Sequence, residues 1–209
     1  MGGVLVAAFE PFGGEVVNAS WEAVQRLGAA GDGRDRIHIA CLPCAYTRSA
    51  EALRREIGVV QPDIVLIVGQ SAGQAEIRLE RVALNLDDAA LADNDREVRS
   101  ERAIAPQGPA AYLAALPVAR IADVLRRAGI PARVSLSAGT YVCNHAFYEA
   151  ARLSESQGGA PIVGLVHVPV TPAQAAGRPG SPSMATDVVA EALGLIVELS
   201  RAELAAGVA

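Results

Sequence analysis

The sequence predicts an α/β fold, a single-domain three-layer α/β/α sandwich around a twisted, mostly parallel central sheet. Short apolar runs, typical of buried parallel strands, alternate along the chain with segments that have the apolar spacing of amphipathic helices. A length of 209 residues and a hydrophobic content of 51% are enough for one well-buried domain over residues 1–209. The sequence contains no internal repeat, so it gives no sign of a second structural unit.

The first part of the chain is predicted to form strand, helix, strand, helix and strand in that order. Its three apolar runs, the predicted strands, are residues 4–9, 37–42 and 63–68. The two segments of helical spacing between them are residues 21–27 and 47–59. Asn18 or Ser20 can cap the first of these helices, and Gly28 can close it. Pro62 stops the second helix.

The second part of the chain continues the alternation. Its predicted strands are residues 77–86, 133–137 and 161–168. Its predicted helices are residues 117–128, 143–153 and 184–205. The polar segment 87–108 is predicted to be a long irregular loop with a function, and the Pro- and Gly-rich segment 169–182 a mobile flap. In a sheet of this kind, ligands are expected beyond the carboxyl ends of the strands.

Composition and charge argue against several classes of function. The formal net charge is −5, and the 18 basic residues form no basic cluster, so no nucleic-acid partner is expected. A membrane-spanning helix needs about 18 consecutive apolar residues, and no apolar run in the sequence approaches that length. No membrane contact is therefore expected. Three cysteines, with no leader pattern before Val4, do not suit a secreted disulfide framework, and the predicted location is cytoplasmic.

Cys143 is the strongest candidate for a nucleophile. The strand-like residues 133–137 are followed by a turn of small residues at Ala138-Gly139, and the next helical pattern begins at Cys143. Unpaired N–H groups and the positive end of the helix dipole favour the thiolate at such a position. The alternative interpretation is a buried structural cysteine.

Three histidines could serve Cys143 as a base. His145 is two residues away on the same helix and therefore points about 200° away from the cysteine. His38 lies inside a strand, where a partly buried imidazole with a structural partner is the ordinary interpretation. His167 ends the last strand, and the turn that carries Cys143 is expected to open at the same edge of the sheet. We therefore expect His167 to be the base.

A cysteine–histidine pair usually needs a third group that orients the imidazole and stabilises its cation. The candidate carboxylates are Glu10, Glu76, Glu80, Asp87 and Asp88. Their spacing along the chain does not distinguish among them.

Two other motifs are given structural interpretations. Cys41 and Cys44 form a CxxC pair, but no second pair or neighbouring histidine pair completes a zinc site, so both are predicted to be structural thiols. Gly13-Gly14 follows an aromatic residue but belongs to neither of the glycine-rich phosphate-binding motifs. No metal and no nucleotide cofactor are expected.

Four longer motifs then occur in a fixed order: Phe9-Glu10-Pro11-Phe12-Gly13-Gly14, Glu80-Arg81-Val82-Ala83-Leu84-Asn85, Gly139-Thr140-Tyr141-Val142-Cys143-Asn144-His145 and Val166-His167-Val168-Pro169. Together they resemble the pyroglutamyl peptidase (pyrrolidone-carboxylate peptidase) family over nearly the whole chain. The resemblance implies a cysteine peptidase that hydrolyses the amide bond after an N-terminal pyroglutamyl residue. It implies a catalytic triad of Cys143, His167 and Glu80, no cofactor, and a homo-oligomer, either a tetramer or a dimer.

The substrate implied by the resemblance needs a particular kind of pocket. Pyroglutamate is a neutral lactam, so its pocket requires apolar walls and a few fixed hydrogen-bonding groups. Phe9 and Phe12 are expected to supply walls. By the resemblance, the other expected contacts are Tyr141 and Val142, which add to the walls, and Asn18 and Gln70, which are polar.

One departure from the family pattern leaves two alternatives open. Ala90 stands where many members have an arginine that is expected near the active site. The chain could therefore be a non-catalytic or weakly active homologue that binds pyroglutamyl peptides. It could also be a related cysteine amidohydrolase for another small cyclic acyl group, which a comparison of acyl amides would identify.

Overall fold

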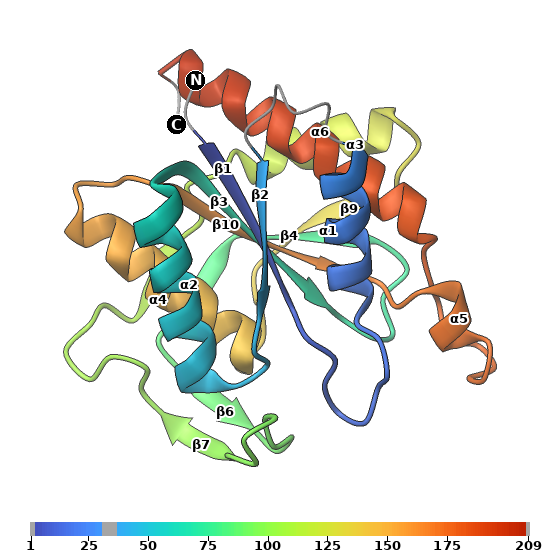
Figure 1. The fold of residues 1–209 in the computed structure, drawn as a ribbon, viewed down its shortest axis with the longest axis horizontal. Helices are drawn as coiled ribbons and strands as arrows, with labels where there is room; N and C mark the ends of the chain where they lie inside the picture. Colours follow the sequence, from blue (N-terminus) through green and yellow to red (C-terminus); the bar gives the residue numbers. More distant parts are fainter. Residues whose placement is uncertain (1–2, 31–36, 208–209) are drawn as a thin grey trace.

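A six-stranded sheet forms the centre of the computed structural model, which describes residues 3–30 and 37–207 (Figure 1). From one edge to the other, its strands are β2 (Ile37–Leu42), β1 (Gly3–Phe9), β3 (Pro62–Gln70), β10 (Ile162–Val168), β4 (Ile77–Glu80) and β9 (Ala132–Ser135). The first four run parallel to one another, whereas β4 pairs antiparallel with β10, and β9 is parallel to β4. The mostly parallel sheet predicted from the sequence is confirmed.

Helices cover both faces of this sheet (Figure 1). One face packs against α1 (Ala19–Ala30), α3 (Val118–Arg127) and α6 (Thr186–Ala205). The other face packs against α2 (Tyr46–Val60) and α4 (Val142–Ser156). Side chains of β1 alternate between the two cores, with Val4 and Val6 on one side and Leu5 and Phe9 on the other. The predicted three-layer α/β/α sandwich is therefore confirmed.

The predicted irregular loop over residues 87–108 is partly wrong. Its ends contain a hairpin of β6 (Asp87–Ala89) and β7 (Arg99–Arg102), and a second small ladder joins β5 (Val82–Leu84) to β8 (Ala111–Leu113). The residues of β6 and β7 are mostly polar, so they lack the apolar alternation by which a strand is identified in a sequence.

The prediction that Gly28 closes the first helix is also wrong, because α1 continues through it to Ala30. A Cβ atom on Gly28 would lie 3.0 Å from the Ile39 side chain of β2, so this glycine permits close helix–sheet packing. The start of the helix agrees better with the sequence, because the Asn18 side-chain oxygen accepts a hydrogen bond from the Ser20 N–H at 3.0 Å.

The segment 169–182 contains a short helix, α5 (Pro172–Ala175). Thr171 caps it, and the Gln174 side chain bonds back to the Thr171 N–H, which completes a capping box. Closure of this segment as a flap stays a prediction. Within residues 3–30 and 37–207, no helix combines the length and apolar character required to cross a membrane.

Candidate active site

A cavity of about 640 Å³ opens beyond the carboxyl ends of β1, β3 and β10. Each of these strands ends in a residue, or next to one, that lines the cavity: Phe9 on β1, Gln70 on β3 and His167 on β10. Cys143, in the first turn of α4, lines the same cavity. Most of the groups singled out in the sequence therefore meet at the edge where parallel sheets bind ligands.

His167 lies between a carboxylate and a thiol. Its Nδ1 atom is 2.9 Å from Oε1 of the fully buried Glu80. On the other side of the ring, a Cβ atom placed on Gly69 would lie 2.9 Å from His167 Nε2 and 2.8 Å from Cys143 Sγ. The ring nitrogen and the sulfur are thus neighbours above Gly69, so the order of groups is carboxylate, imidazole and thiol.

Strand register explains why Glu80 reaches His167. In the antiparallel pair of β4 and β10, Glu80 lies opposite Leu165 and Arg78 lies opposite His167. Residues directly opposite one another point to the same face, as do alternate residues of one strand. Glu80 and His167 therefore share the face that packs against α4, where Cys143 is located.

The path of the chain to Cys143 differs from the expected one. Because β9 runs antiparallel to β10, the carboxyl ends of these two strands point to opposite edges of the sheet. The turn that carries Cys143 nevertheless opens at the edge where His167 lies, as predicted, since Ala138, Gly139 and His167 line the same cavity. Residues 136–141 instead carry the chain from Ser135 to the start of α4 at Val142. Cys143 still reaches His167, because this connection, and not the strand, determines where α4 begins.

The thiol of Cys143 is more strongly desolvated than the sequence suggests. Burial raises the pKa of Cys143 well above its usual value, and the nearby Cys44 and Glu80 raise it further, whereas a backbone hydrogen bond lowers it. Burial therefore opposes the thiolate that the start of α4 favours, and formation of the thiolate stays a prediction. The sulfur lies next to a ring nitrogen that can accept the thiol proton during attack.

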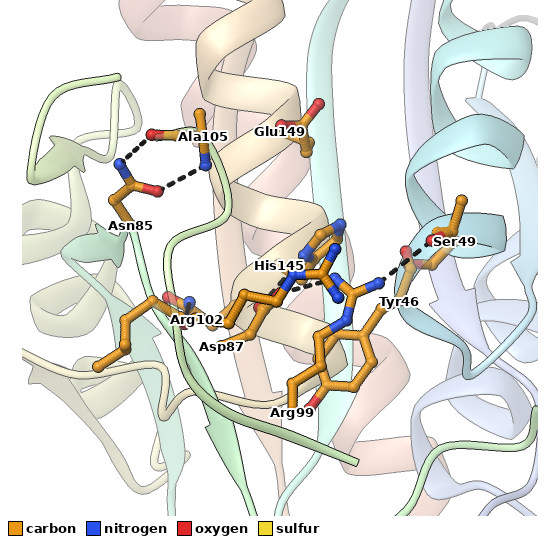
Figure 2. A network of polar contacts seen from close by, with 12 residues as sticks. Tyr46, Ser49, Asn85, Asp87, Arg99, Arg102, Ala105, His145 and Glu149 are labelled. Atoms are coloured by element: carbon orange, nitrogen blue, oxygen red, sulfur yellow. Dashed lines mark hydrogen bonds and ion pairs between the residues drawn. The ribbon is translucent and has the colours of Figure 1, made fainter. Parts of the chain in front are cut away.

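The other histidines lie away from this group. Figure 2 shows His145 beside Asp87 and Arg99, and the distance from His145 Nδ1 to Asp87 Oδ2 is 2.9 Å. Asp87 also accepts a hydrogen bond from Arg99 at 2.7 Å. His38 is exposed on the edge strand β2, so its predicted partial burial is wrong.

The remaining candidate carboxylates are engaged elsewhere. The Glu10 side chain accepts hydrogen bonds from the Cys44 N–H and the Asn94 amide, at 3.0 and 2.8 Å. Glu76 forms an ion pair with Arg133, and the exposed Asp88 accepts a hydrogen bond from Ser100. Among the five candidates, only Glu80 forms a hydrogen bond with His167 within the described ranges.

Aromatic side chains form one side of the cavity. Phe9, Phe12 and Tyr141 line it, and the ring centroids of Phe12 and Tyr141 are 6.0 Å apart. The Tyr141 hydroxyl donates a hydrogen bond to the Ala92 carbonyl at 3.0 Å. Val142 is fully buried in the core beneath α4 and is not part of the cavity lining, so its side chain is not placed to form a wall.

The two predicted polar contacts are fixed by hydrogen bonds of their own. Gln70 Oε1 accepts from the Ala19 N–H at 2.7 Å and from the Gln174 amide at 3.0 Å. The Asn18 amide donates to the Glu10 carbonyl at 3.0 Å. Both residues line the cavity. The two donors bonded to the Gln70 oxygen hold this side chain in one orientation at the cavity.

The other two cysteines, Cys41 and Cys44, are also free thiols. Cys44 lines the cavity, but burial raises its pKa to about 12, so it is a poor nucleophile. Cys41 is exposed on β2. Ala90 is exposed and does not line the cavity, although its neighbour Leu91 does.

The sequence alone did not identify two residues of this site, Gly69 and Arg78. Gly69 follows a long apolar run, and nothing in that pattern shows that two reactive atoms lie above it. Arg78 gives a clearer signal, since a charged residue between Ile77 and Leu79 in a predicted strand indicates a side chain on the opposite face from the apolar core.

Comparisons with known proteins agree with this geometry. A family model described as pyroglutamyl peptidase matches residues 2–202. A pyrrolidone-carboxylate peptidase of Pectobacterium carotovorum is 45% identical over 200 residues, covering 96% of this chain and 93% of the relative. Pyrrolidone-carboxylate peptidase 1 of Ralstonia nicotianae is 46% identical over 195 residues, covering 93% and 91% of the two chains.

Two solved structures are similar to the whole fold. Pyroglutamyl peptidase I of Bacillus amyloliquefaciens matches with a TM-score of 0.92 at 39% identity, covering 97% of this chain and 98% of that one. A mutant pyrrolidone carboxyl peptidase of Pyrococcus furiosus matches with a TM-score of 0.92 at 34% identity, covering 96% and 99% of the two chains.

Proposed function

This chain belongs to the pyroglutamyl peptidase family and is therefore an omega-peptidase, and we propose that Cys143, His167 and Glu80 carry out its reaction. The substrate is a peptide with an N-terminal pyroglutamyl residue, and the amide bond after that residue is hydrolysed. The observation that carries the assignment of roles is the order of groups around His167, with Glu80 on Nδ1 and the Cys143 sulfur near Nε2.

The first half of the reaction forms an acyl-enzyme. Cys143 Sγ attacks the scissile carbonyl carbon while its proton passes to His167 Nε2, and Glu80 stabilises the imidazolium that results. Because α4 begins at Val142, the N–H groups of its first turn lack helical partners and can donate to the oxyanion. The carbon–nitrogen bond then breaks, and the departing amine takes the proton from His167.

The second half restores the enzyme. His167, now neutral, removes a proton from a water molecule as that water attacks the thioester carbonyl. The carbon–sulfur bond breaks, the sulfur recovers a proton from His167, and free pyroglutamate leaves. The hydrogen bond from Nδ1 to Glu80 keeps the ring in the orientation that both halves require.

The cavity suits a neutral lactam. Phe9, Phe12 and Tyr141 offer apolar and aromatic surface, and the Gln70 amide is fixed beside them by its bonds to Ala19 and Gln174. A site built to hydrogen-bond the lactam leaves its own polar groups unpaired when the substrate carries plain proline instead. Binding of proline at this position is therefore strongly disfavoured.

Substrate selectivity tests this proposal directly. The purified protein is assayed with pyroglutamyl, prolyl and glutamyl arylamides, and kcat/KM for the pyroglutamyl compound is expected to exceed the other two by at least about 100-fold. Faster cleavage of another acyl amide would identify a related amidohydrolase. Binding of a pyroglutamyl peptide with no cleavage would identify a binding homologue.

We further propose that residues 1–209 act as one catalytic domain in the cytoplasm and assemble as a homo-oligomer, either a tetramer or a dimer. A reducing compartment suits a chain whose cysteines are free thiols and whose reaction needs one of them reduced. The assembly is implied by the family resemblance. Sedimentation velocity distinguishes the monomer, the dimer and the tetramer.

A further inference from the structure

Arg78 is a charged residue of the cavity that the proposed chemistry does not use. Its side chain lines the cavity, and its Nε atom is buried without a hydrogen-bond partner. Among residues 3–30 and 37–207, the Arg78 guanidinium group forms no hydrogen bond and no ion pair. A guanidinium nitrogen removed from water without a partner is energetically costly, so this position favours a partner that enters from the cavity.

The charged groups around Arg78 do not neutralise it. Arg78 lies opposite His167 on β10 and opposite Arg133 on β9, and Glu80 is on the same face two residues along β4. Glu80 Oε1 is hydrogen-bonded to His167, whereas Glu80 Oε2 is buried without a hydrogen-bond partner. Glu76 is paired with Arg133. The cavity acid Glu15 is paired with Arg178. Glu76 and Glu15 are thus paired with other arginines, and among the described residues none of the three carboxylates forms a hydrogen bond or ion pair with Arg78.

The order of strands in the sheet indicates which part of the substrate lies next to Arg78. Along the sheet the order is β1, β3, β10 and β4, so Phe9, Gln70, His167 and Arg78 follow one another across the cavity. The aromatic end at Phe9 suits the lactam, and His167 protonates the departing amine. Arg78 is the next cavity residue beyond His167 in this order, on the side of the leaving group.

We propose that Arg78 binds a carboxylate of the leaving group and so determines specificity for the residue that follows pyroglutamate. This inference rests on the proposed function. The carboxylate has two sources: the side chain of an acidic second residue, or the free α-carboxylate of a pyroglutamyl dipeptide. Arginine presents several N–H donors in a planar fork that matches a carboxylate, and such charge-assisted bonds are strong where water is partly excluded.

Four substrates distinguish the two sources. Pyroglutamyl-glutamate α-amide carries only the side-chain carboxylate, and pyroglutamyl-glutamine amide is its neutral match. Pyroglutamyl-alanine carries only the α-carboxylate, and pyroglutamyl-alanine amide is its neutral match. In each pair the measured quantity is the ratio of kcat/KM for the acid to kcat/KM for the neutral compound, which cancels any general change in catalysis.

The wild-type protein is expected to prefer the acid in at least one pair by about tenfold, and the pair that shows the preference identifies the source. Arg78→Gln is expected to lower that ratio about tenfold, whereas Arg78→Lys retains part of it because the charge is kept. A purely structural role for Arg78 would change both members of a pair equally and leave the ratio unaltered.

Arg133→Gln is the matched control. It removes one positive charge from the same sheet face on the adjacent strand, but Arg133 is paired with Glu76 and does not line the cavity. Its ratio is expected to equal that of the wild type. The assignment of Arg78 would be overturned if Arg78→Gln kept the acid-to-neutral ratio of the wild type. It would also be overturned if Arg133→Gln lost as much of that ratio as Arg78→Gln. In either case, cleavage of the substrates would still uphold the proposed function. Failure to cleave any of the four would overturn the proposed function, and this inference with it.

Discussion

Gly69 is the residue that leaves room for the reacting groups. It lies near the end of β3, directly beneath the space shared by Cys143 and His167. A single methyl group there would lie 2.8 Å from the sulfur and 2.8 Å from His167 Cδ2, closer than Cβ atoms in proteins approach other atoms. The absence of a side chain at this one position is therefore part of the geometry by which the thiol and the imidazole meet.

Gly69→Ala is expected to lower kcat/KM by at least about 100-fold, because a displacement of about 1 Å in the reacting groups is enough for a loss of that size. The measurement is hydrolysis of a pyroglutamyl arylamide together with thermal unfolding. Gly58→Ala in α2 is the control, since a Cβ there meets nothing within 4 Å, and it is expected to keep full activity. Full activity in Gly69→Ala would contradict the described arrangement of sulfur and ring.

At the scale of elements, a buried ionic cluster joins the β6–β7 hairpin to the helices that carry the site (Figure 2). Asp87 on β6 contacts Arg99 on β7 at 2.7 Å and His145 on α4 at 2.9 Å. The Arg99 guanidinium lies 4.3 Å from the centre of the Tyr46 ring on α2. Because His145 is two residues from Cys143, this cluster helps to hold the start of α4 in place.

Asp87→Asn is expected to destabilise the fold by about 1–3 kcal/mol, because the buried Arg99 loses one of its two carboxylate partners and keeps only Glu97. Urea unfolding monitored by circular dichroism measures the change in the free energy of unfolding. Asp95→Asn serves as the comparison, since its ion pair with Arg48 is half-exposed and is expected to matter little. Equal effects of the two substitutions would show that the cluster does not stabilise this part of the fold.

The elements differ in how far the sequence predicts them. The long apolar runs of β1, β3 and β10 are evident because buried parallel strands have this composition. The hairpin of β6 and β7 is not evident, since its stability comes largely from contacts such as Asp87 with Arg99 that are formed only in the folded chain. The reversed direction of β4 and β9 depends on how the connections cross the sheet, which no local pattern records.

At the scale of the whole molecule, the sandwich brings together cavity residues from separate parts of the chain. Phe9, Gln70, Cys143 and His167 come from three strands and one helix. Spacing and strand position predict Cys143 and His167 as candidates. They do not predict Glu80, because its contact with His167 arises from the pairing of β4 with β10, 87 residues apart in sequence. That role is implied by the family resemblance, and the geometry supports it.

The central claim is that Cys143 and His167 perform the hydrolysis. The most direct measurement is kcat/KM for a pyroglutamyl arylamide in the wild type, Cys143→Ala and His167→Ala, with thermal unfolding as the test of folding. Each substitution is expected to lower kcat/KM by at least about 1,000-fold without loss of the fold, whereas Cys41→Ala, at an exposed thiol on β2, is expected to leave it unchanged. A folded Cys143→Ala protein that retains activity within tenfold of the wild type would contradict the claim.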